Sequence, residues 1–255
     1  MTLTAGNEAR LLMACLGDHL AELPYFTIVQ DRTSVDCVIA QQLASQFGLV
    51  WRAQTAQIAG DTEQERWRLT VGHSLTGSNM RLHPTVDAVG NCAMIGGLGG
   101  EIGRAFLWRN HANNSRTPSP AELAKRLKLP FTKRIESNFE RWLAGLPAGT
   151  DPIMTYELAY IELRMSCWAF AQSYTNPNSV QIAPLVSRSN FVHMLSLSQG
   201  IRRSQSLASQ IVKRRNPDLL SLPINRFGDL RDYSMWINKI RRYLASRVSG
   251  RRSAT

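Results

Sequence analysis

The stretch TAGNEARLLMACL, residues 4–16, decides how the fold of this chain is interpreted, because a glycine turn here runs directly into an amphipathic helix. Leu12, Leu16 and Leu20 recur every four residues, as on one face of an α-helix. The turn Thr4-Ala5-Gly6 would present the backbone N–H groups at the start of that helix, at the positive end of its dipole. The stretch therefore predicts a place for a phosphate group.

Short apolar runs alternate with helical patterns over the first 110 residues or so. The runs YFTIVQ (25–30), LVWRA (49–53) and CAMIG (92–96) are typical of strands. This alternation predicts an α/β fold with an open, mainly parallel sheet and helices on both of its faces. The helical patterns between the strands are carried by Val35, Ile39, Leu43 and Phe47, with Gly48 as the stop, and by Trp67, Val71 and Leu75.

The chain after residue 111 is expected to be helical, with no further strand. A polar segment, residues 112–120, ends in Ser119 and Pro120, which begin a capping box. Asp151 caps the run Ile153–Tyr174, which is apolar nearly all round and is typical of a buried helix. We expect a nucleotide-binding α/β part over residues 1–111. A helical part over 112–255 would pack on it and end in a basic helix, Asp229–Val248, and a tail.

Composition limits the class of protein. The 255 residues are 44% hydrophobic, enough to bury a full core, and no apolar run approaches the roughly 20 residues of a membrane span. The cysteines show neither a zinc-binding nor a disulfide pattern, which fits a reducing compartment, so a cytoplasmic location is expected. They are Cys15, Cys37, Cys92 and Cys167.

The net charge of +11 leaves a nucleic-acid partner open. No recognition motif or interleaved aromatic residues accompany the basic runs, so a solvated basic face is the favoured interpretation. The runs lie late in the chain, at Arg202-Arg203, Lys213-Arg214-Arg215, Lys239 to Arg242 and Arg251-Arg252.

Ligands bind open α/β sheets beyond the carboxyl ends of the strands, and this rule gives further candidates. Gln30 ends the first apolar run, and a glycine-rich loop, residues 96–101, ends the third. That loop closes with Glu101, a candidate Mg²⁺ ligand, and precedes an expected helix with Arg104. Arg104 is suited to a carboxylate or phosphate partner, so Glu101 and Arg104 are the candidate catalytic residues.

Three segments in this order resemble the synthetase domain of asparagine synthase, a member of the PP-loop ATP pyrophosphatases. They are LTAGNEARLL (3–12), SVDCVIAQQLASQFGLVW (34–51) and AMIGGLGGEIGRAF (93–106). A looser resemblance continues through ELRMSCWAF (162–170), the segment 181–203 and NPDLLSLPINR (216–226), so it covers roughly residues 2 to 227.

The resemblance implies that ATP activates a carboxylate as an acyl-adenylate, that pyrophosphate leaves on Mg²⁺, and that an amine then attacks to form an amide. The first loop of the family would correspond to Thr4, Ala5, Gly6, Glu8 and Ala9, and its third loop to Gly97, Gly99 and Glu101. Glu8 and Glu101 would then be the Mg²⁺ ligands, and ATP the bound nucleotide.

This sequence departs from the family pattern in its loops. Ala9 lacks the hydroxyl of the last loop serine, and Ala5 replaces a glycine. Leu98 stands where asparagine synthases carry a glutamate, and Arg226 is near the place of a family lysine. The strand before the first loop is reduced to MTLT (1–4), from which we expect upstream residues to be missing.

Three functions stay open. The first is an ATP-dependent amide ligase with small-molecule carboxylate and amine substrates; the second is a non-catalytic protein that keeps the PP-loop fold for binding or assembly. The third is a PP-loop enzyme acting on tRNA. A homo-oligomer is also open. Further charged candidates are the cluster Glu157, Glu162 and Arg164 on the long helix, Arg188 in the segment matched to the family, and Arg109.

Overall fold

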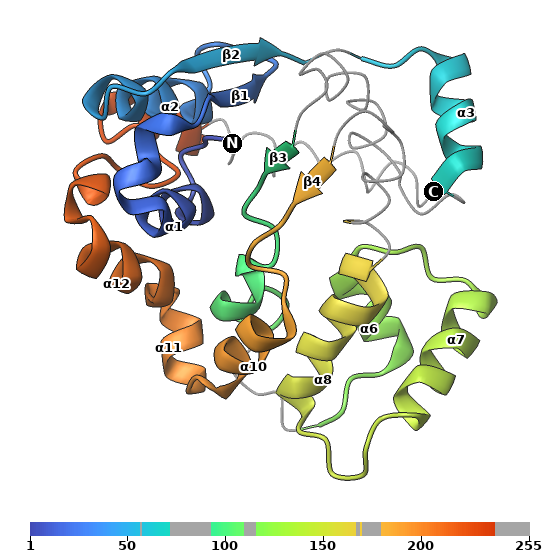
Figure 1. Cartoon of the computed structure of the whole chain (residues 1–255). Coiled ribbons are helices and arrows are strands. Elements are labelled where there is room, and N and C mark those ends of the chain that lie inside the picture. Colours follow the sequence, from blue (N-terminus) through green and yellow to red (C-terminus); the bar gives the residue numbers. More distant parts are fainter. Residues whose placement is uncertain (57, 72–92, 110–115, 167–168, 170–179, 238–255) are drawn as a thin grey trace. The chain divides into compact units, whose positions relative to one another are not determined.

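The computed structural model describes residues 1–56, 58–71, 93–109, 116–166, 169 and 180–237 (Figure 1). The chain divides into two compact units: unit 1 is formed by residues 1–55 and 212–255, and unit 2 by residues 56–211. The sequence placed a division at residue 111 instead. The difference arises because the C-terminal part returns to the N-terminal residues, where the Arg10 guanidinium donates to the backbone oxygen of Pro223 (2.8 Å).

Unit 1 is built around short parallel strands. β1 (Tyr25–Val29) pairs in parallel with β2 (Trp51–Thr55), with Tyr25 opposite Trp51. Along its other edge, β1 accepts the extended N-terminal residues through a parallel bridge between Thr2 and Phe26, in which the Leu3 N–H donates to the Phe26 oxygen (2.9 Å). The order is therefore the N-terminal segment, β1 and β2. The two strands predicted here are confirmed, β2 beginning two residues later than expected.

The helices of unit 1 end where the sequence places glycines. α1 (Asn7–Leu16) stops at Gly17, whose φ is +56°, and the predicted Leu20 lies in a separate 3₁₀ turn, η1 (Gly17–Glu22). α2 (Val35–Gln46) stops before Gly48 at φ +62°. The N–H groups of Gly48 and Leu49 donate to the oxygens of Ser45 and Ala44, the pair of bonds typical of a Schellman motif. Gly48 is thus confirmed as the helix stop.

Further C-terminal helices complete the described part of unit 1. α12 (Ser206–Arg215) crosses the boundary between the units, and the 3₁₀ turn η5 (Pro217–Leu220) follows it. Residues 230–237 are helical, which is the described portion of the helix predicted from Asp229 to Val248.

Unit 2 contains a second pair of parallel strands, β3 (Ala93–Ile95) and β4 (Val180–Ile182), with Met94 opposite Gln181. The expectation that no strand follows residue 111 is therefore wrong. β4 has only three residues, too few to produce a recognisable alternation in the sequence, and its partner lies far away in the chain. Since both units combine helices with parallel strands, the fold class is α/β.

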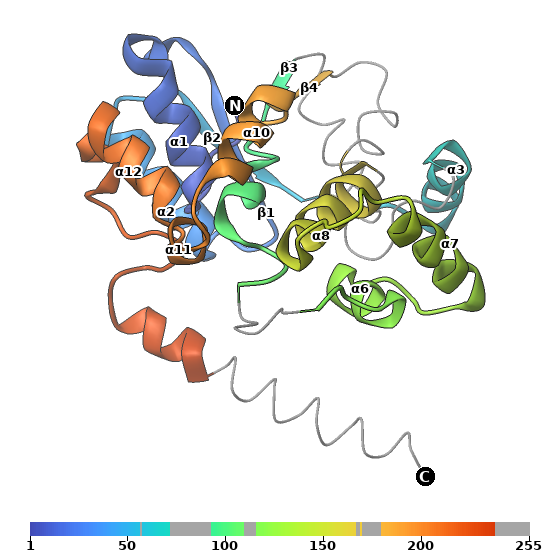
Figure 2. The ribbon, with the colours of Figure 1, turned by 90° about the horizontal axis from the view of Figure 1, so that it is seen from below.

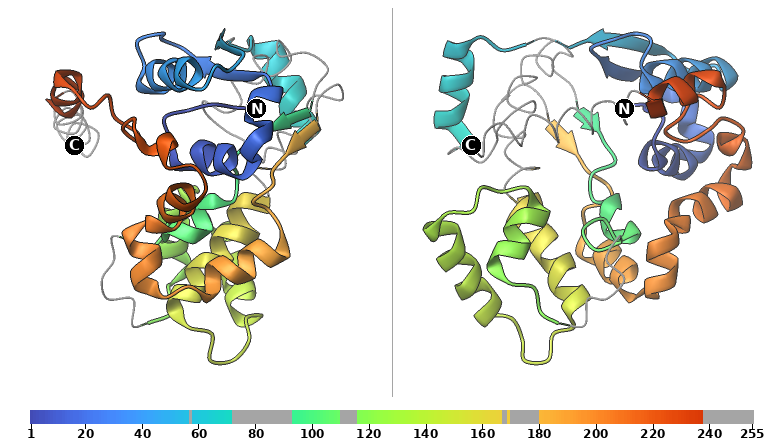
Figure 3. Two further views of the ribbon diagram at one scale, coloured as in Figure 1. Left: turned by 60° about the vertical axis from the view of Figure 1, so that its left-hand side comes forward. Right: turned by 180° about the vertical axis from the view of Figure 1, so that it is seen from behind.

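The helices of unit 2 begin at caps that the sequence predicts. The Ser119 hydroxyl accepts from the Glu122 N–H at the start of α6 (Pro120–Leu127), and the Asp151 carboxylate accepts from the Ile153 N–H at the start of α8 (Pro152–Ala159). α6, α7 (Lys133–Ala144) and α8 lie side by side in Figures 1 and 3. Their apolar sides contribute Leu123, Leu127 and Tyr156 to a core that also contains Ile102 and Trp108.

The helix predicted over Ile153–Tyr174 changes its winding partway. α8 passes into a π-helical turn, η3 (Tyr160–Met165), and both end residues of this turn are buried. In a π-helical turn, residues five apart lie one above the other, so Tyr160 and Met165 can face the same core. Most of the predicted helix after residue 166 lies outside the described residues.

The remaining elements of unit 2 are short. They are α3 (Asp61–Val71), the 3₁₀ turn η2 (Gly100–Arg104), α10 (Arg188–Ser196) and α11 (Gln199–Ser204). The predicted Leu75 and Cys92 lie outside the described residues. No helix in the described part of the chain has the length and hydropathy needed to cross a bilayer.

Candidate functional site

The turn Thr4–Gly6 lies where the N-terminal extended segment ends and α1 begins. Gly6 is the N-cap residue of α1, with an extended backbone (φ −77°), and no side chain caps this helix. By contrast, α2, α6 and α8 are capped by the side chains of Ser34, Ser119 and Asp151. As a glycine, Gly6 supplies no side-chain cap to the first turn of α1, which suits an anion-binding helix start.

The backbone of Ala5 is held from both sides. Its N–H donates to Asp36 Oδ1 (2.9 Å), and its oxygen accepts from Arg10 Nη1 (2.7 Å) and from the Asn225 N–H (3.0 Å). Asp36 comes from the first turn of α2, and Asn225 from the segment after η5. Ala5, a candidate nucleotide contact, therefore supports the turn, and its N–H is engaged by a carboxylate.

Oxygen atoms of three side chains surround one side of Gly6. Thr4 Oγ1 accepts from the Gly6 N–H (3.2 Å). A Cβ atom added at Gly6 would lie 3.3 Å from Thr4 Oγ1, 3.6 Å from Glu8 Oε2 and 3.7 Å from Asn225 Oδ1. Hydroxyl, carboxylate and amide oxygens are ligands that Mg²⁺ accepts. The structure thus brings the predicted Thr4, Gly6 and Glu8 together, and it adds Asn225.

The sequence analysis did not predict three residues of this site. Arg10 is fully buried, whereas an arginine in a helix is ordinarily expected at the surface. Asp36 could have been found from the sequence, since it is an acidic residue in the first turn of a predicted helix. Asn225 has a left-handed backbone (φ +55°), which asparagine adopts more readily than most residues. Gln30, a predicted contact, is exposed just after β1, at the edge of the parallel strands where the Thr4–Gly6 turn also lies.

The second glycine loop has a structural reason for its central glycine. Gly99 has φ +95°, and a Cβ there would lie 3.0 Å from Val186 Cγ2 and 3.3 Å from the Leu185 oxygen. Glu101 Oε2 accepts from the Gly99 N–H (3.0 Å), so this carboxylate stabilises its own loop. The expected helix after the loop is instead the five-residue 3₁₀ turn η2, and Arg104 ends it.

The predicted site residues fall into the two units. The Arg104 guanidinium lies 5.7 Å from the centre of the Phe106 ring, and Arg109, Arg188 and Arg226 are exposed. Unit 1 holds Thr4, Ala5, Gly6, Glu8 and Gln30, and unit 2 holds Gly97, Gly99, Glu101 and Arg104.

An ion pair between Glu157 and Arg202 is buried in the core of unit 2. Glu157 Oε1 accepts hydrogen bonds from Arg202 Nη1 (2.8 Å) and from Trp108 Nε1. Glu157 is 1% exposed and Arg202 is 5% exposed, and the Arg202 guanidinium lies 5.1 Å from the centre of the Trp108 ring. Because every group is enclosed in the helical core, this arrangement stabilises the fold and offers no open position to a substrate.

The charged candidates on the long helix contact residues of different elements. Glu162 Oε2 accepts from Trp142 Nε1 (2.7 Å), and Arg164 donates to the backbone oxygen of Leu127. Glu157, Glu162 and Arg164 therefore have separate partners.

We expect the stability of the protein to fall as pH rises between about 4.5 and 7 because of Glu157. Burial raises the pKa of Glu157 from 4.5 to about 7, against the opposing hydrogen bonds from Trp108 and Arg202. In this window the folded chain keeps a proton that the unfolded chain has released. Raising the pH therefore lowers the free energy of unfolding by at most about 1.4 kcal/mol per pH unit, and the contribution is lost above the folded pKa.

Urea unfolding of the wild type and of Glu157→Gln, from about pH 5 to about pH 8, measures this dependence. The glutamine variant keeps the volume and cannot titrate, so the wild type should lose stability relative to it as the pH rises. If the free energy of unfolding of the wild type stayed constant or rose relative to that of the glutamine variant as the pH increases, the assignment would be contradicted.

Metal-binding groups and thiols add little to the site. Within the described ranges, no three His, Cys, Asp or Glu side chains form a group suited to a metal ion. Cys15 is an exposed free thiol and Cys37 a buried one, and burial raises the pKa of Cys37. Cys167 lies outside the described residues.

No protein-family model matches the chain, and no curated protein is significantly similar to it in sequence.

Proposed function

We propose that the chain is an ATP-dependent amide ligase of the asparagine-synthase type, which binds the nucleotide phosphates at the turn Thr4–Glu8. The observation that carries this proposal is the start of α1, which has no side-chain cap and is bordered by the oxygens of Thr4, Glu8 and Asn225. Backbone N–H groups and a helix dipole there suit a phosphate.

The strand order of unit 1 supports the same proposal. The N-terminal segment, β1 and β2 are parallel, and the turn Thr4–Gly6 follows the carboxyl end of the first of them. Ligands of open α/β sheets bind at this edge. The complete fold we propose is the PP-loop type, an open parallel sheet covered by helices on both faces, with a helical C-terminal part.

We propose that the oxygen atoms around Gly6 hold a magnesium ion, because hydroxyl, carboxylate and amide oxygens are suitable ligands. Thr4, Glu8 and Asn225 would hold this ion within unit 1, and Glu101 is a separate candidate ligand within unit 2. When bound, Mg²⁺ supplies charge neutralisation for a pyrophosphate leaving group. The N–H groups of the first turn of α1 would orient the phosphates, and the Ala5 contacts with Asp36 and Arg10 would keep the turn in place.

The proposed reaction has two steps. A carboxylate oxygen of the substrate attacks the α-phosphorus of ATP, and the bond to the pyrophosphate oxygen breaks. An amine then attacks the acyl-adenylate carbon, which forms the amide and releases AMP. Arg104 is the residue that we propose to face the carboxylate or a phosphate, since its guanidinium can donate to two oxygens at once.

A non-catalytic binding protein is the second candidate, and specific contacts favour it. The Ala5 N–H is engaged by Asp36, and the Gly99 N–H by Glu101. These two N–H groups are satisfied within the protein and are not offered to a phosphate. A PP-loop enzyme acting on tRNA rests only on the net charge of +11.

Binding of Mg·ATP should depend on the open side of Gly6. Gly6→Ala fits the backbone, because its φ of −77° suits alanine, but the methyl group occupies the space among the three oxygens. We expect ATP at 100 times its dissociation constant to stabilise the wild type by about 2.7 kcal/mol in thermal unfolding, and the variant to bind at least about tenfold more weakly.

The matched control is Gly60→Ala, where the nearest atom to an added Cβ lies 3.9 Å away. This variant should bind Mg·ATP as the wild type does. Absence of any shift at millimolar Mg·ATP, or equal binding by Gly6→Ala, would contradict the nucleotide site. Binding without pyrophosphate release across a panel of carboxylates and amines would favour the non-catalytic candidate.

A further inference from the structure

The helix of residues 230–237 exposes large apolar side chains. It is the orange-red helix nearest the C-terminal end of the described chain in Figure 2. Leu230 is 89% exposed, Tyr233 64% and Trp236 57%. The Tyr233 and Trp236 rings stack on each other with their centres 5.9 Å apart. Exposed apolar side chains that lie next to one another often mark a surface that contacts a partner or a membrane.

The three most exposed of these side chains lie on one side of the helix, whereas Met235, 41% exposed, lies on another. Leu230, Tyr233 and Ile237 follow the spacing of one helical face, and Trp236 borders it. The sequence beyond residue 237 repeats the spacing with Ile240 and Leu244. The pattern is that of an amphipathic helix whose apolar side is rich in aromatic and aliphatic residues.

The sequence after Asp232 carries charges of one sign only. Residues 237–255 contain six arginines and lysines and no acidic residue. In the sequence, Lys239 and Arg242 fall between the apolar positions Ile237, Ile240 and Leu244. An apolar aromatic side combined with a cationic side is typical of helices that lie in the interface of anionic membranes.

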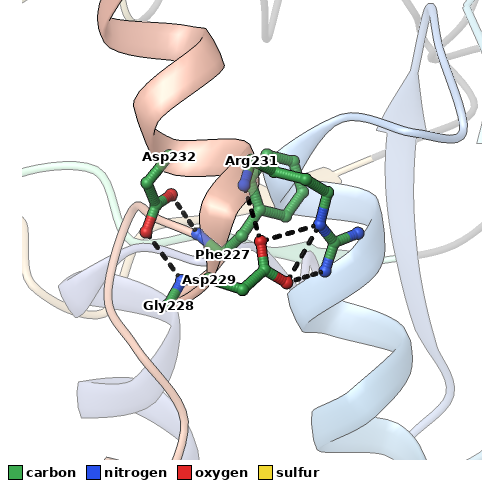
Figure 4. Close-up of polar contacts among 5 residues, drawn as sticks. All are labelled: Phe227, Gly228, Asp229, Arg231 and Asp232. Carbon is green, nitrogen blue, oxygen red and sulfur yellow. Dashed lines mark hydrogen bonds and ion pairs between the residues drawn. The ribbon is translucent and has the colours of Figure 1, made fainter.

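The acidic residues at the start of the helix are held by internal contacts (Figure 4). Asp232 accepts from the N–H groups of Phe227 (2.7 Å) and Gly228 (2.8 Å). Asp229 pairs with Arg231 (2.7 Å), whose guanidinium lies 4.2 Å from the centre of the Phe227 ring. Arg231 lowers the pKa of Asp229 through this hydrogen bond. These contacts fix the start of the helix and leave Leu230 pointing outward.

We infer that the helix beginning at residue 230 binds the surface of an anionic lipid bilayer, with Leu230, Tyr233 and Trp236 in the interfacial layer. The basic residues that follow would contact lipid phosphates, each contributing about 1 kcal/mol near the surface. An RNA partner would use the cations and the aromatic rings but not aliphatic residues such as Leu230 and Ile237. The continuous aliphatic and aromatic side therefore favours lipid over nucleic acid.

The test is sedimentation of the full chain with vesicles of phosphatidylcholine, alone or mixed with phosphatidylglycerol. The wild type should bind the mixed vesicles at least about tenfold more tightly than the neutral ones, and added salt should weaken the binding. The double variant Leu230→Ser/Trp236→Ser should lose about tenfold or more of this affinity, since it removes two apolar side chains. Both side chains are exposed, so the variant keeps its fold.

The matched control is Leu69→Ser, which removes an exposed leucine (73%) from α3. It should bind the mixed vesicles as the wild type does. Equal binding by the wild type and the double variant, or no binding to the mixed vesicles, would overturn the inference. Tighter binding to single-stranded RNA that ignores the Leu230 and Trp236 substitutions would also overturn it and assign the basic residues to nucleic acid.

Discussion

Glu157→Ala lowers the free energy of unfolding of unit 2 by about 3–5 kcal/mol at about pH 8. At this pH the Glu157 carboxylate is ionised, and it accepts from Arg202 Nη1 at 2.8 Å and from Trp108 Nε1. Both charged side chains are nearly inaccessible to water. Removing the carboxylate leaves the Arg202 guanidinium buried with no counter-charge, and the cost of burying that charge falls on the folded state. Urea unfolding followed by tryptophan fluorescence measures the change.

Two further variants separate the ion pair from other effects. Glu162→Ala removes an exposed carboxylate that also accepts from a tryptophan, Trp142, and it should cost under about 1 kcal/mol. The double variant Glu157→Leu/Arg202→Met replaces both charges by apolar groups and should recover much of the lost stability. A loss below about 1 kcal/mol for Glu157→Ala would contradict the buried pair.

Arg10→Ala destabilises unit 1 by about 3–5 kcal/mol, the second large effect that we expect. The Arg10 side chain is fully buried, and it donates to the backbone oxygens of Ala5, Leu222 and Pro223. Burial lowers the pKa of Arg10 to about 10, so the group stays charged at neutral pH. Alanine would leave a cavity and remove the donor from all three oxygens. The free energy of unfolding from urea titrations reports the loss.

Arg10→Met separates the loss of volume from the loss of hydrogen bonds, since methionine fills most of the arginine volume and donates no hydrogen bond. It should keep more stability than alanine but still lose about 2 kcal/mol or more. The control is Arg32→Ala, which truncates an exposed arginine of unit 1 and should change the stability by no more than about 0.5 kcal/mol. If Arg10→Met were as stable as the wild type, the three backbone contacts would not hold the segments together as described.

Features of the fold that depend on neighbouring residues could be predicted from the sequence. Gly48 ends α2, and Ser119 and Asp151 begin α6 and α8, because capping depends on chemistry within a few residues. β4 could not be predicted, because a three-residue strand is defined by its partner β3 rather than by its own pattern. The two-unit division was also missed, since it depends on contacts such as Arg10 to Leu222, which are 212 residues apart.

The candidate site follows the same rule. Thr4, Gly6 and Glu8 are neighbours in the sequence, so their grouping at the start of α1 could be predicted. Asn225 reaches the same turn only through the folded chain, and the engagement of the Ala5 N–H by Asp36 is likewise a tertiary contact. ATP, Mg²⁺ and amide formation stay predictions, because they depend on ligands that the sequence and the fold alone do not contain.

The return of residues 212–237 to the N-terminal segment sets an order of events during synthesis. The ribosome releases the first 55 residues early, but the oxygens of Leu222 and Pro223 that receive Arg10 emerge more than 200 residues later. Unit 2 is continuous, and all of its residues are made before Leu222 and Pro223. Residues 1–55 are therefore made before unit 2 but gain these partners only after it, and until then the Arg10 guanidinium lacks the acceptors that it has in the folded chain.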